Sequence, residues 1–235
     1  MTIIYHHEVI QYTPEWDALK CGVLSASKIC EILTPTKLEI ADNKTSKELI
    51  NTIACQRILK TIEPTFQSYD MLRGLREEVL ARKVYADNYA PVKECGFVTN
   101  DKWGFKLGCS PDGLVNDDGL LEIKSRLNKL QFGVIRAGKM PDEYRLQVHA
   151  QLMITGRPWC DFISYSGGMN MITLRVEPDL VVWKAIENAA FDFEAKVQMA
   201  MEEYGNRISD KTLRIVPVPV TPEGDEIITT QEIAA

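Results

Sequence analysis

The spacing of hydrophobic and polar positions changes along the chain, and in the first 90 residues it is mainly helical. Apolar residues recur there at intervals of three and four, which is typical of amphipathic helices. The spacing predicts helices at 22–33, 46–62 and 69–89. Ser25 is the expected cap of the first helix, and the polar segment 34–46 is the expected loop after it. In the third helix the stripe expected to face the core consists of Met71, Leu72, Leu75, Val79 and Val84.

From residue 92 onward, short apolar runs bounded by turn residues indicate strands. The expected strands are 92–100, 103–115, 120–126, 160–166 and 169–177, and the helical spacing returns at 142–156 and 178–204. Asn116-Asp117-Asp118-Gly119 is the expected hairpin turn between the second and third strands. Helices before and between strands predict an α/β fold with a central mixed β-sheet flanked by helices.

Composition indicates one ordinary globular domain, which we place at residues 1–211. The segment 212–235 is rich in proline and polar residues and is expected to be a peripheral or disordered tail. The net charge of −6 excludes a wholly basic nucleic-acid binder but not a local basic groove. No signal peptide or membrane span is evident, and the six cysteines show no CxxC spacing. We therefore expect a cytoplasmic protein with free thiols and no zinc or iron–sulfur centre.

Three charged residues in CSPDGLVNDDGLLEIKSR (109–126) point to metal-assisted chemistry. Glu122 and Lys124 are two apart in a strand, so they share one face. Asp112 lies across the hairpin, from where it can return beside Glu122. Two adjacent carboxylates are hard to keep ionised without a cation, and oxygen ligands suit magnesium or manganese. The alternative is an exposed strand that bears a Glu–Lys pair, with an aspartate in a turn.

Neighbouring segments add further candidates. The residues after Glu122 are mostly basic, as a groove for a polyanion requires. Glu78 lies at the edge of the apolar stripe of helix 69–89 and is a better candidate than Glu77 to face the sheet; alternatively, it pairs with Arg82 at the surface. The helix at 142–156 carries Tyr144, Gln147 and Gln151 on one face, where they can hold a water or phosphate oxygen or be ordinary surface residues.

Taken together, these segments resemble the phage lambda exonuclease family, the viral-type alkaline exonucleases of the PD-(D/E)XK nuclease superfamily. CSPDGL followed by GLLEIK is similar to the catalytic hairpin of that family, and WDALKCGVLSAS (16–27) is similar to its N-terminal segment. Gly74 with Glu78 matches its helical acid, and EYRLQVHAQL matches its Tyr-x-x-Gln helix. The resemblance runs in order from about residue 16 to 165 and implies a restriction-endonuclease-like core with an N-terminal helical segment.

The resemblance also implies roles for individual residues. Asp112, Glu122 and the carbonyl of Ile123 would bind metal, with Glu78 assisting directly or through water. Lys124 would position and activate the attacking water. Gln147 would support that lysine or the scissile phosphate, with Tyr144 nearby. The residues implied for the pocket of the terminal 5′-phosphate are Lys20, Ser27 and Ser110, and the one implied to split the terminal base pair is Met71.

The activity implied is 5′–3′ exonuclease digestion of linear double-stranded DNA in phage recombination. It would release mononucleotides from 5′-phosphorylated ends, leave 3′ overhangs and use two Mg²⁺ ions per active site, for which Mn²⁺ can substitute. The family forms ring-shaped homotrimers and works with a phage single-strand annealing protein in the bacterial host cytoplasm. Lys20 departs from the arginine of the lambda enzyme, which leaves the strength of 5′-phosphate dependence open, and segment 34–46 has no clear match.

Two alternative functions remain at this point. One is an endonuclease or single-strand DNA nuclease of the same superfamily, which would share the catalytic residues but not the dependence on DNA ends. The other is a non-catalytic DNA-binding recombination subunit, which would be expected to lack part of the catalytic set.

Overall fold

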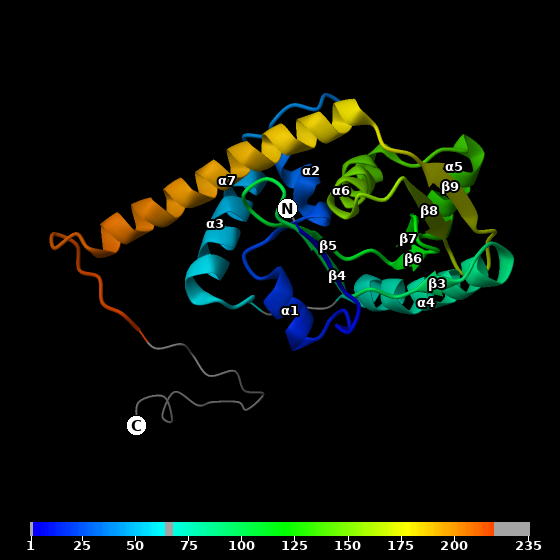
Figure 1. The fold of residues 1–235 in the computed structure, drawn as a ribbon, viewed down its shortest axis with the longest axis horizontal. Helices are drawn as coiled ribbons and strands as arrows, with labels where there is room; N and C mark the ends of the chain where they lie inside the picture. The colour runs from blue at the N-terminus through cyan, green and yellow to red at the C-terminus, as the bar shows by residue number, and fades with distance from the viewer. Residues whose placement is uncertain (1, 64–67, 219–235) are drawn as a thin grey trace, which may run out of the picture. The chain divides into compact units, whose positions relative to one another are not determined.

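The fold belongs to the expected α/β class, with helices around mixed sheets (Figure 1). A computed structural model describes residues 2–63 and 68–218 of the chain. The helices are α1 (Pro14–Lys20), α2 (Ile29–Ile32), α3 (Lys44–Leu59), α4 (Tyr69–Asn88), α5 (Asn128–Ala137), α6 (Arg145–Thr155) and α7 (Leu180–Ile208), with 3₁₀ turns η1 (Ala26–Lys28) and η2 (Asp142–Tyr144). The strands are β1 (Ile3–His6), β2 (Leu24–Ser25), β3 (Val92–Lys93), β4 (Phe97–Asn100), β5 (Leu107–Cys109), β6 (Gly113–Val115), β7 (Gly119–Ser125), β8 (Trp159–Tyr165) and β9 (Ile172–Val176).

The strands are divided between two mixed sheets, where the sequence predicted one central sheet. One sheet has the order β1-β4-β5-β2 and the other β3-β6-β7-β8-β9. Segments 92–100 and 103–115, each expected as one strand, both break and send their two halves to different sheets. The first break includes Gly96, where a Cβ would lie 2.0 Å from the Val9 carbonyl oxygen, so only glycine fits this close approach. The second break places Ser110, Pro111 and Asp112 between the sheets.

The predicted hairpin is confirmed in β6 and β7. These strands pair antiparallel from Val115 with Gly119 to Gly113 with Leu121, and Asn116 has a φ of 47° in the turn. Asparagine tolerates this left-handed conformation better than most residues do. The longer strand β7 continues to Ser125, beyond its last pair with β6, and stays paired with β8 on its other edge. The edge of β7 that faces Asp112 is therefore open.

Each face of the second sheet packs against different helices. Leu121 and Ile123 point toward α4, where they pack with Ala81 and Tyr85. The alternate residues of β7 point to the opposite face, where Leu120 joins the main core with residues of α6 and α7. Figure 1 shows α4 and α6 on opposite sides of β6 and β7.

Helix α4 is present as predicted, but the prediction that its apolar stripe faces the core was wrong. Of its five residues, Leu75 is half-buried and Met71, Leu72, Val79 and Val84 are exposed, while the buried positions of the helix are Ala81 and Tyr85. The face of α4 toward the sheet is lined by small and polar residues together with Tyr85. The spacing of large apolar residues therefore did not identify this face.

Three other local expectations also differ from the structure. Segment 22–33 is not one helix, because Leu24 and Ser25 pair in parallel with Leu107 and Gly108 before the chain turns through η1 into α2. The Ser25 side chain makes no cap hydrogen bond. Strand β1 and helix α5 were not anticipated. The segments at 46–62, 142–156 and 178–204 are helical as predicted.

The chain falls into two units, 1–201 and 202–235. The first unit contains both sheets. Of the second, the structure describes the end of α7 and an exposed segment that reaches residue 218. The domain boundary expected at 211 stays a prediction, and most of the expected tail, 219–235, lies outside the described residues. All six cysteines are free thiols, and no helix in the described ranges is long and apolar enough to cross a membrane.

Candidate active site

The open edge of β7 holds Asp112. The backbone N–H of Asp112 donates to the carbonyl of Leu121 (3.1 Å), and its Oδ2 accepts a 2.6 Å hydrogen bond from the backbone N–H of Ile123. The Asp112 carboxylate thus takes the place of the backbone carbonyl that would accept this hydrogen bond if β6 extended further along β7. By strand alternation the Ile123 carbonyl faces the same edge. The Oδ1 atom of Asp112 has no hydrogen-bond partner within residues 2–63 and 68–218.

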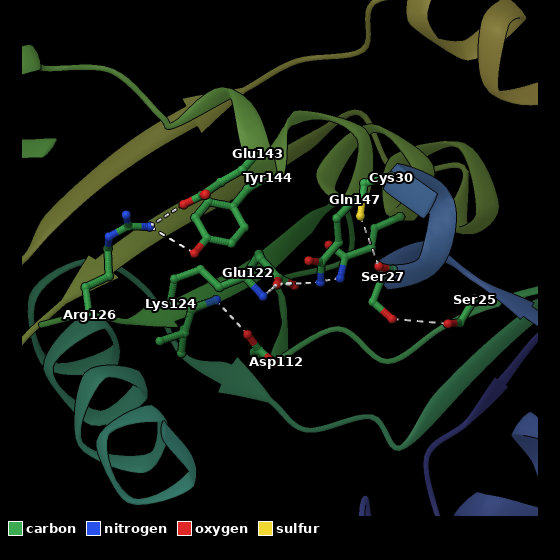
Figure 2. A network of polar contacts seen from close by, with 12 residues as sticks. Ser25, Ser27, Cys30, Asp112, Glu122, Lys124, Arg126, Glu143, Tyr144 and Gln147 are labelled. Atoms are coloured by element: carbon green, nitrogen blue, oxygen red, sulfur yellow. Dashed lines mark hydrogen bonds and ion pairs between the residues drawn. The ribbon is translucent and has the colours of Figure 1, made fainter. Parts of the chain in front are cut away.

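Glu122 lies at the centre of the site, on the β7 face that packs against α6. It is 1% exposed. Its Oε1 accepts from Gln147 Nε2 at 2.7 Å and lies 2.6 Å from Lys124 Nζ, while its Oε2 accepts from Gln151 Nε2 at 2.6 Å. Figure 2 shows Glu122 beside Asp112, Lys124 and Gln147. The predicted shared face of Glu122 and Lys124 is confirmed, and a buried carboxylate replaces the alternative of an exposed ion pair.

The electrostatics of this cluster are set first by burial and then by neighbouring carboxylates. Burial, and then the charges of Glu122 and Glu78, raise the pKa of Asp112 well above its ordinary value. Burial alone would lower the pKa of Lys124, but the charges of Glu122 and Asp112 outweigh it and raise the pKa above the ordinary lysine value. Lys124 is therefore held as an ammonium ion, and the cluster still carries more acids than bases.

Both acids of α4 are half-buried, and they have different partners. Glu78 forms a short contact with Arg82, the partner expected at i+4, yet burial and the charge of Glu122 still raise its pKa. Glu77 accepts a 2.6 Å hydrogen bond from Ser125 Oγ at the end of β7. Glu77 therefore also faces the sheet, while Glu78 is the acid whose charge acts on the Asp112–Glu122 pair.

The α6 end of the site is closed by an aromatic residue and two cations. Lys124 Nζ lies 5.2 Å from the ring centroid of Tyr144. The Tyr144 hydroxyl accepts a 2.9 Å hydrogen bond from Arg126, which is 7% exposed. The sequence had not identified Arg126 as part of the site. Its buried guanidinium fixes the ring that borders Lys124.

Two of the residues expected to bind a terminal phosphate, Lys20 and Ser110, contact Trp16 and form with it the Trp16 cluster. Trp16 is largely buried, and its Nε1 donates to Ser110 Oγ at 2.8 Å. Lys20 Nζ lies 3.3 Å from the Trp16 ring centroid, and burial lowers the pKa of Lys20. Ser27 is exposed and follows β2, and Ser110 follows β5, so both serines leave the same end of a parallel strand pair. Met71 is exposed in the first turn of α4.

Besides Arg126, two further residues that organise the site were missed or undervalued at the sequence level. Gln151 is fully buried against Glu122, so it is not the ordinary surface residue that was one alternative. Its spacing of four from Gln147 was the available signal. Trp16 had no visible partner in the sequence, because its contacts with Ser110 and Gly96 come from segments more than 75 positions away.

The donor set at this edge fits a hard divalent cation completed by substrate. Among the described residues, no three acidic, histidine or cysteine side chains group closely enough to hold a metal ion by themselves. Magnesium is commonly held by one or two carboxylates together with waters and substrate phosphates. Asp112, with its unpartnered Oδ1, and Glu122 supply two such carboxylates.

Comparison with known proteins identifies relatives of this arrangement. The profile of the YqaJ-like viral recombinase domain matches residues 15–158. An alkaline exonuclease (LHK-Exo) from Laribacter hongkongensis is similar at 29% identity and a TM-score of 0.74, covering 84% of this chain and 98% of that chain. Its complex with dAMP aligns at 30% identity with the same TM-score and coverage. A phage related exonuclease from Haemophilus somnus 129PT, at 10% identity and a TM-score of 0.54, shares the fold over 77% of this chain and 96% of that chain. No curated protein sequence matches the chain.

Proposed function

The chain belongs to the family of the YqaJ-like viral recombinase domain, and from this premise we propose that it is a 5′–3′ exonuclease of linear double-stranded DNA in phage recombination. One observation carries the proposal: the buried Glu122, held by Gln147 and Gln151, meets Asp112 and Lys124 at the open edge of β7. The similar protein from Laribacter hongkongensis is described as an alkaline exonuclease and was solved with dAMP, a deoxynucleoside monophosphate. Such a mononucleotide is the expected product of this reaction.

Metal dependence is part of the proposal. Asp112, Glu122 and the Ile123 carbonyl would hold Mg²⁺, with Glu78 assisting directly or through water. Two ions per site suit hydrolysis of a phosphodiester, and Mn²⁺ can substitute because it accepts the same oxygen ligands. The bound cation supplies polarisation of the phosphate and a water of lowered pKa.

The side chains of the site then have separate tasks. Lys124, as an ammonium ion, donates a hydrogen bond that orients the attacking water and balances the charge that develops on the phosphate. Gln147 and Gln151 hold both oxygens of Glu122, so that the carboxylate does not have to reorganise during the reaction. Tyr144, fixed by Arg126, borders Lys124 and limits the space open to substrate.

We assign end recognition to the Trp16 cluster together with Ser27 and Met71. Lys20, Ser27 and Ser110 would receive the terminal 5′-phosphate, and Met71 would separate the terminal base pair. The position of Lys20 over Trp16 supports this, since it fixes a cation beside a serine hydroxyl. A lysine acts as a point charge without the bidentate fork of arginine, so the preference for 5′-phosphate would rest on charge more than on geometry.

A homotrimer is the proposed assembly. The exposed apolar residues of α4 beyond Met71, namely Leu72, Val79, Leu80 and Val84, form a surface for contact with a second copy. Light scattering should give a mass of three times 26.6 kDa. The proposed partner is a phage single-strand annealing protein, and the proposed location is the cytoplasm of the bacterial host.

The direct test of the nuclease proposal compares linear and covalently closed circular duplex DNA, each with Mg²⁺ and with EDTA. The proposal expects digestion of the linear DNA only, and only with Mg²⁺. Cutting of the circle would assign the same site to an endonuclease. Binding without any digestion would favour a non-catalytic subunit.

A further inference from the structure

Tyr12 has a backbone conformation that is uncommon for a bulky residue. Its φ is 67°, in the left-handed region that favours glycine. For a large side chain this is an outlier, and it persists only where the surroundings over-determine it. Such residues often occur at binding sites, because the cost is tolerated when the side chain has a use there.

The two neighbours of Tyr12 fix this conformation. Gln11 Nε2 donates to the carbonyl oxygens of Cys95 (3.2 Å) and Pro111 (3.1 Å), which ties the segment to the residue just before Asp112. On the other side, Thr13 caps α1, and its hydroxyl also donates to the Ile10 carbonyl at 2.7 Å. Tyr12 lies between these two anchors, so its position is set by the same segment that positions Asp112.

The Tyr12 side chain lies beside Trp16, within range of the charges of the site's carboxylates. Its ring centroid is 5.0 Å from that of Trp16, the ring over which Lys20 lies. Burial, followed by the charges of Glu78 and Asp112, raises the pKa of Tyr12 to about 12, so its hydroxyl remains a donor at neutral pH. That hydroxyl has no hydrogen-bond partner among the described residues, and Tyr12 as a whole is 53% exposed.

A half-exposed ring with a free donor, beside Trp16 and the proposed phosphate pocket, suits a nucleotide. Aromatic side chains stack on bases irrespective of base identity, as a nuclease that degrades any sequence requires. We propose that Tyr12 is a binding residue for the terminal nucleotide of the 5′ strand, stacking on its base and donating its hydroxyl to a phosphate oxygen. This inference rests on the proposed function and deepens it, because it assigns recognition of the nucleotide to a residue outside the catalytic hairpin.

The backbone conformation makes a sharp test possible. In Tyr12→Gly the ring is lost while the left-handed conformation becomes favourable, so the variant should be no less heat-stable than wild type. Its kcat/KM on 5′-phosphorylated duplex should fall by about tenfold or more, the effect of losing one stacked base contact. Tyr12→Phe keeps the ring and loses the hydroxyl, so its kcat/KM should lie between those of wild type and Tyr12→Gly. The matched control is Asn116→Gly, which relieves a positive φ of 47° in the exposed hairpin turn and should leave kcat/KM unchanged.

A binding measurement separates a nucleotide contact from a structural role. By calorimetry, Tyr12→Gly should weaken binding of dAMP about tenfold and leave binding of inorganic phosphate within twofold. If both ligands weaken equally, Tyr12 only supports the Trp16 cluster, and the inference is wrong. It is also wrong if wild-type protein digests linear DNA and Tyr12→Gly does so within twofold of the same rate. If the wild-type protein digests no DNA, the proposed function fails, and the dAMP and phosphate comparison still decides whether Tyr12 contacts a nucleotide.

Discussion

Nε2 of Gln151 lies 2.6 Å from Oε2 of Glu122, and both side chains are removed from solvent. A carboxylate this deeply buried requires donors, and α6 provides two at a spacing of four residues, Gln147 and Gln151. These two glutamines, for which an ordinary surface position was one interpretation, therefore hold Glu122 in place.

Replacing Gln151 with leucine should therefore reduce both stability and activity. The change removes a donor at similar volume and leaves one oxygen of Glu122 unpaired, which costs about 1–3 kcal/mol. Urea unfolding followed by tryptophan fluorescence should show a loss of that size, and duplex digestion should slow by about tenfold or more. Gln198→Leu is the matched control, because Gln198 donates to Glu194 at 3.0 Å on an exposed helix face. If Gln151→Leu and Gln198→Leu lower the free energy of unfolding by the same amount, the buried hydrogen bond to Glu122 contributes no more than an exposed one, which would contradict this prediction.

Lys124→Ala should abolish digestion without unfolding the protein. The ammonium lies 2.6 Å from Glu122 and is the only cation paired with that buried acid among the described residues. Loss of a positioned donor or proton-transfer group costs about a hundredfold to ten-thousandfold in rate. Initial rates on linear duplex measure this, with circular dichroism as the check of folding. Lys196→Ala, which removes a half-exposed lysine paired with Asp192, should retain full activity. A Lys124→Ala variant that digests DNA at a near wild-type rate would show that the lysine is misassigned.

Lys20→Ala should affect DNA ends selectively. Digestion of 5′-phosphorylated duplex should slow by about tenfold, while digestion of 5′-hydroxyl duplex changes less than twofold, because only the former presents a dianion to the cation beside Ser110. Lys28→Ala is the control, as Lys28 is exposed and paired with Glu31 at 2.7 Å. Equal slowing on both kinds of end would assign Lys20 to general contact with DNA.

Asp112→Asn should raise the melting temperature of the metal-free protein. Burial and the charge of Glu122 raise the folded-state pKa of Asp112, so the folded chain binds this proton more tightly than the unfolded chain does. The stability from this group is fully present below the unfolded pKa and is lost as pH rises through the folded pKa, so at neutral pH burying this carboxyl group costs stability. Asparagine removes that cost and can still accept from the Ile123 N–H.

The same variant should lose the stabilisation that metal provides. Scanning fluorimetry with EDTA and with MgCl₂ should show a higher melting temperature with Mg²⁺ for wild type and no shift for Asp112→Asn. Asp118→Asn, in the exposed hairpin turn, should behave as wild type. A lower melting temperature for metal-free Asp112→Asn would contradict the account of repelling carboxylates.

The hairpin of β6 and β7, with Asp112 beside it, could be predicted because its determinants are local. A turn sequence, a strand period of two and a spacing of ten between Asp112 and Glu122 are enough to bring the three charged residues together. Helix α6 was predictable for the same reason, since its period of 3.6 places Gln147 and Gln151 on one side, and Tyr144 ends the 3₁₀ turn just before it.

The division into two sheets could not be read from the sequence, because it depends on distant pairings. Leu24 pairs with Leu107, and this contact overrides the helical spacing of residues 22–33. Strand β1 pairs with β4 across a long stretch of sequence, with Ile3 opposite Asn100. The spacing of apolar residues within one segment carries no information about such partners.

Two helices show why counting apolar residues was insufficient. Helix α5 faces the sheet with Gln131 and Val134, and Gln131 bonds to backbone carbonyls of Ser164 and Asn170, so half of its buried face is polar. Helix α4 turns its apolar stripe outward and presents Glu77, Glu78 and Tyr85 to the sheet. In both, the inward face is occupied by polar side chains that the apolar pattern could not reveal.

The most direct test of the central claim is a time course on linear duplex DNA with Mg²⁺ that compares 5′-labelled with 3′-labelled ends. The account predicts that the 5′ label is released first, as mononucleotide, while the 3′ label stays on long single strands. Earlier release of the 3′ label, or internal fragments that appear before any mononucleotide, would contradict it. Either result would also remove the assignment of Lys20, Ser27 and Ser110 to a 5′-phosphate pocket.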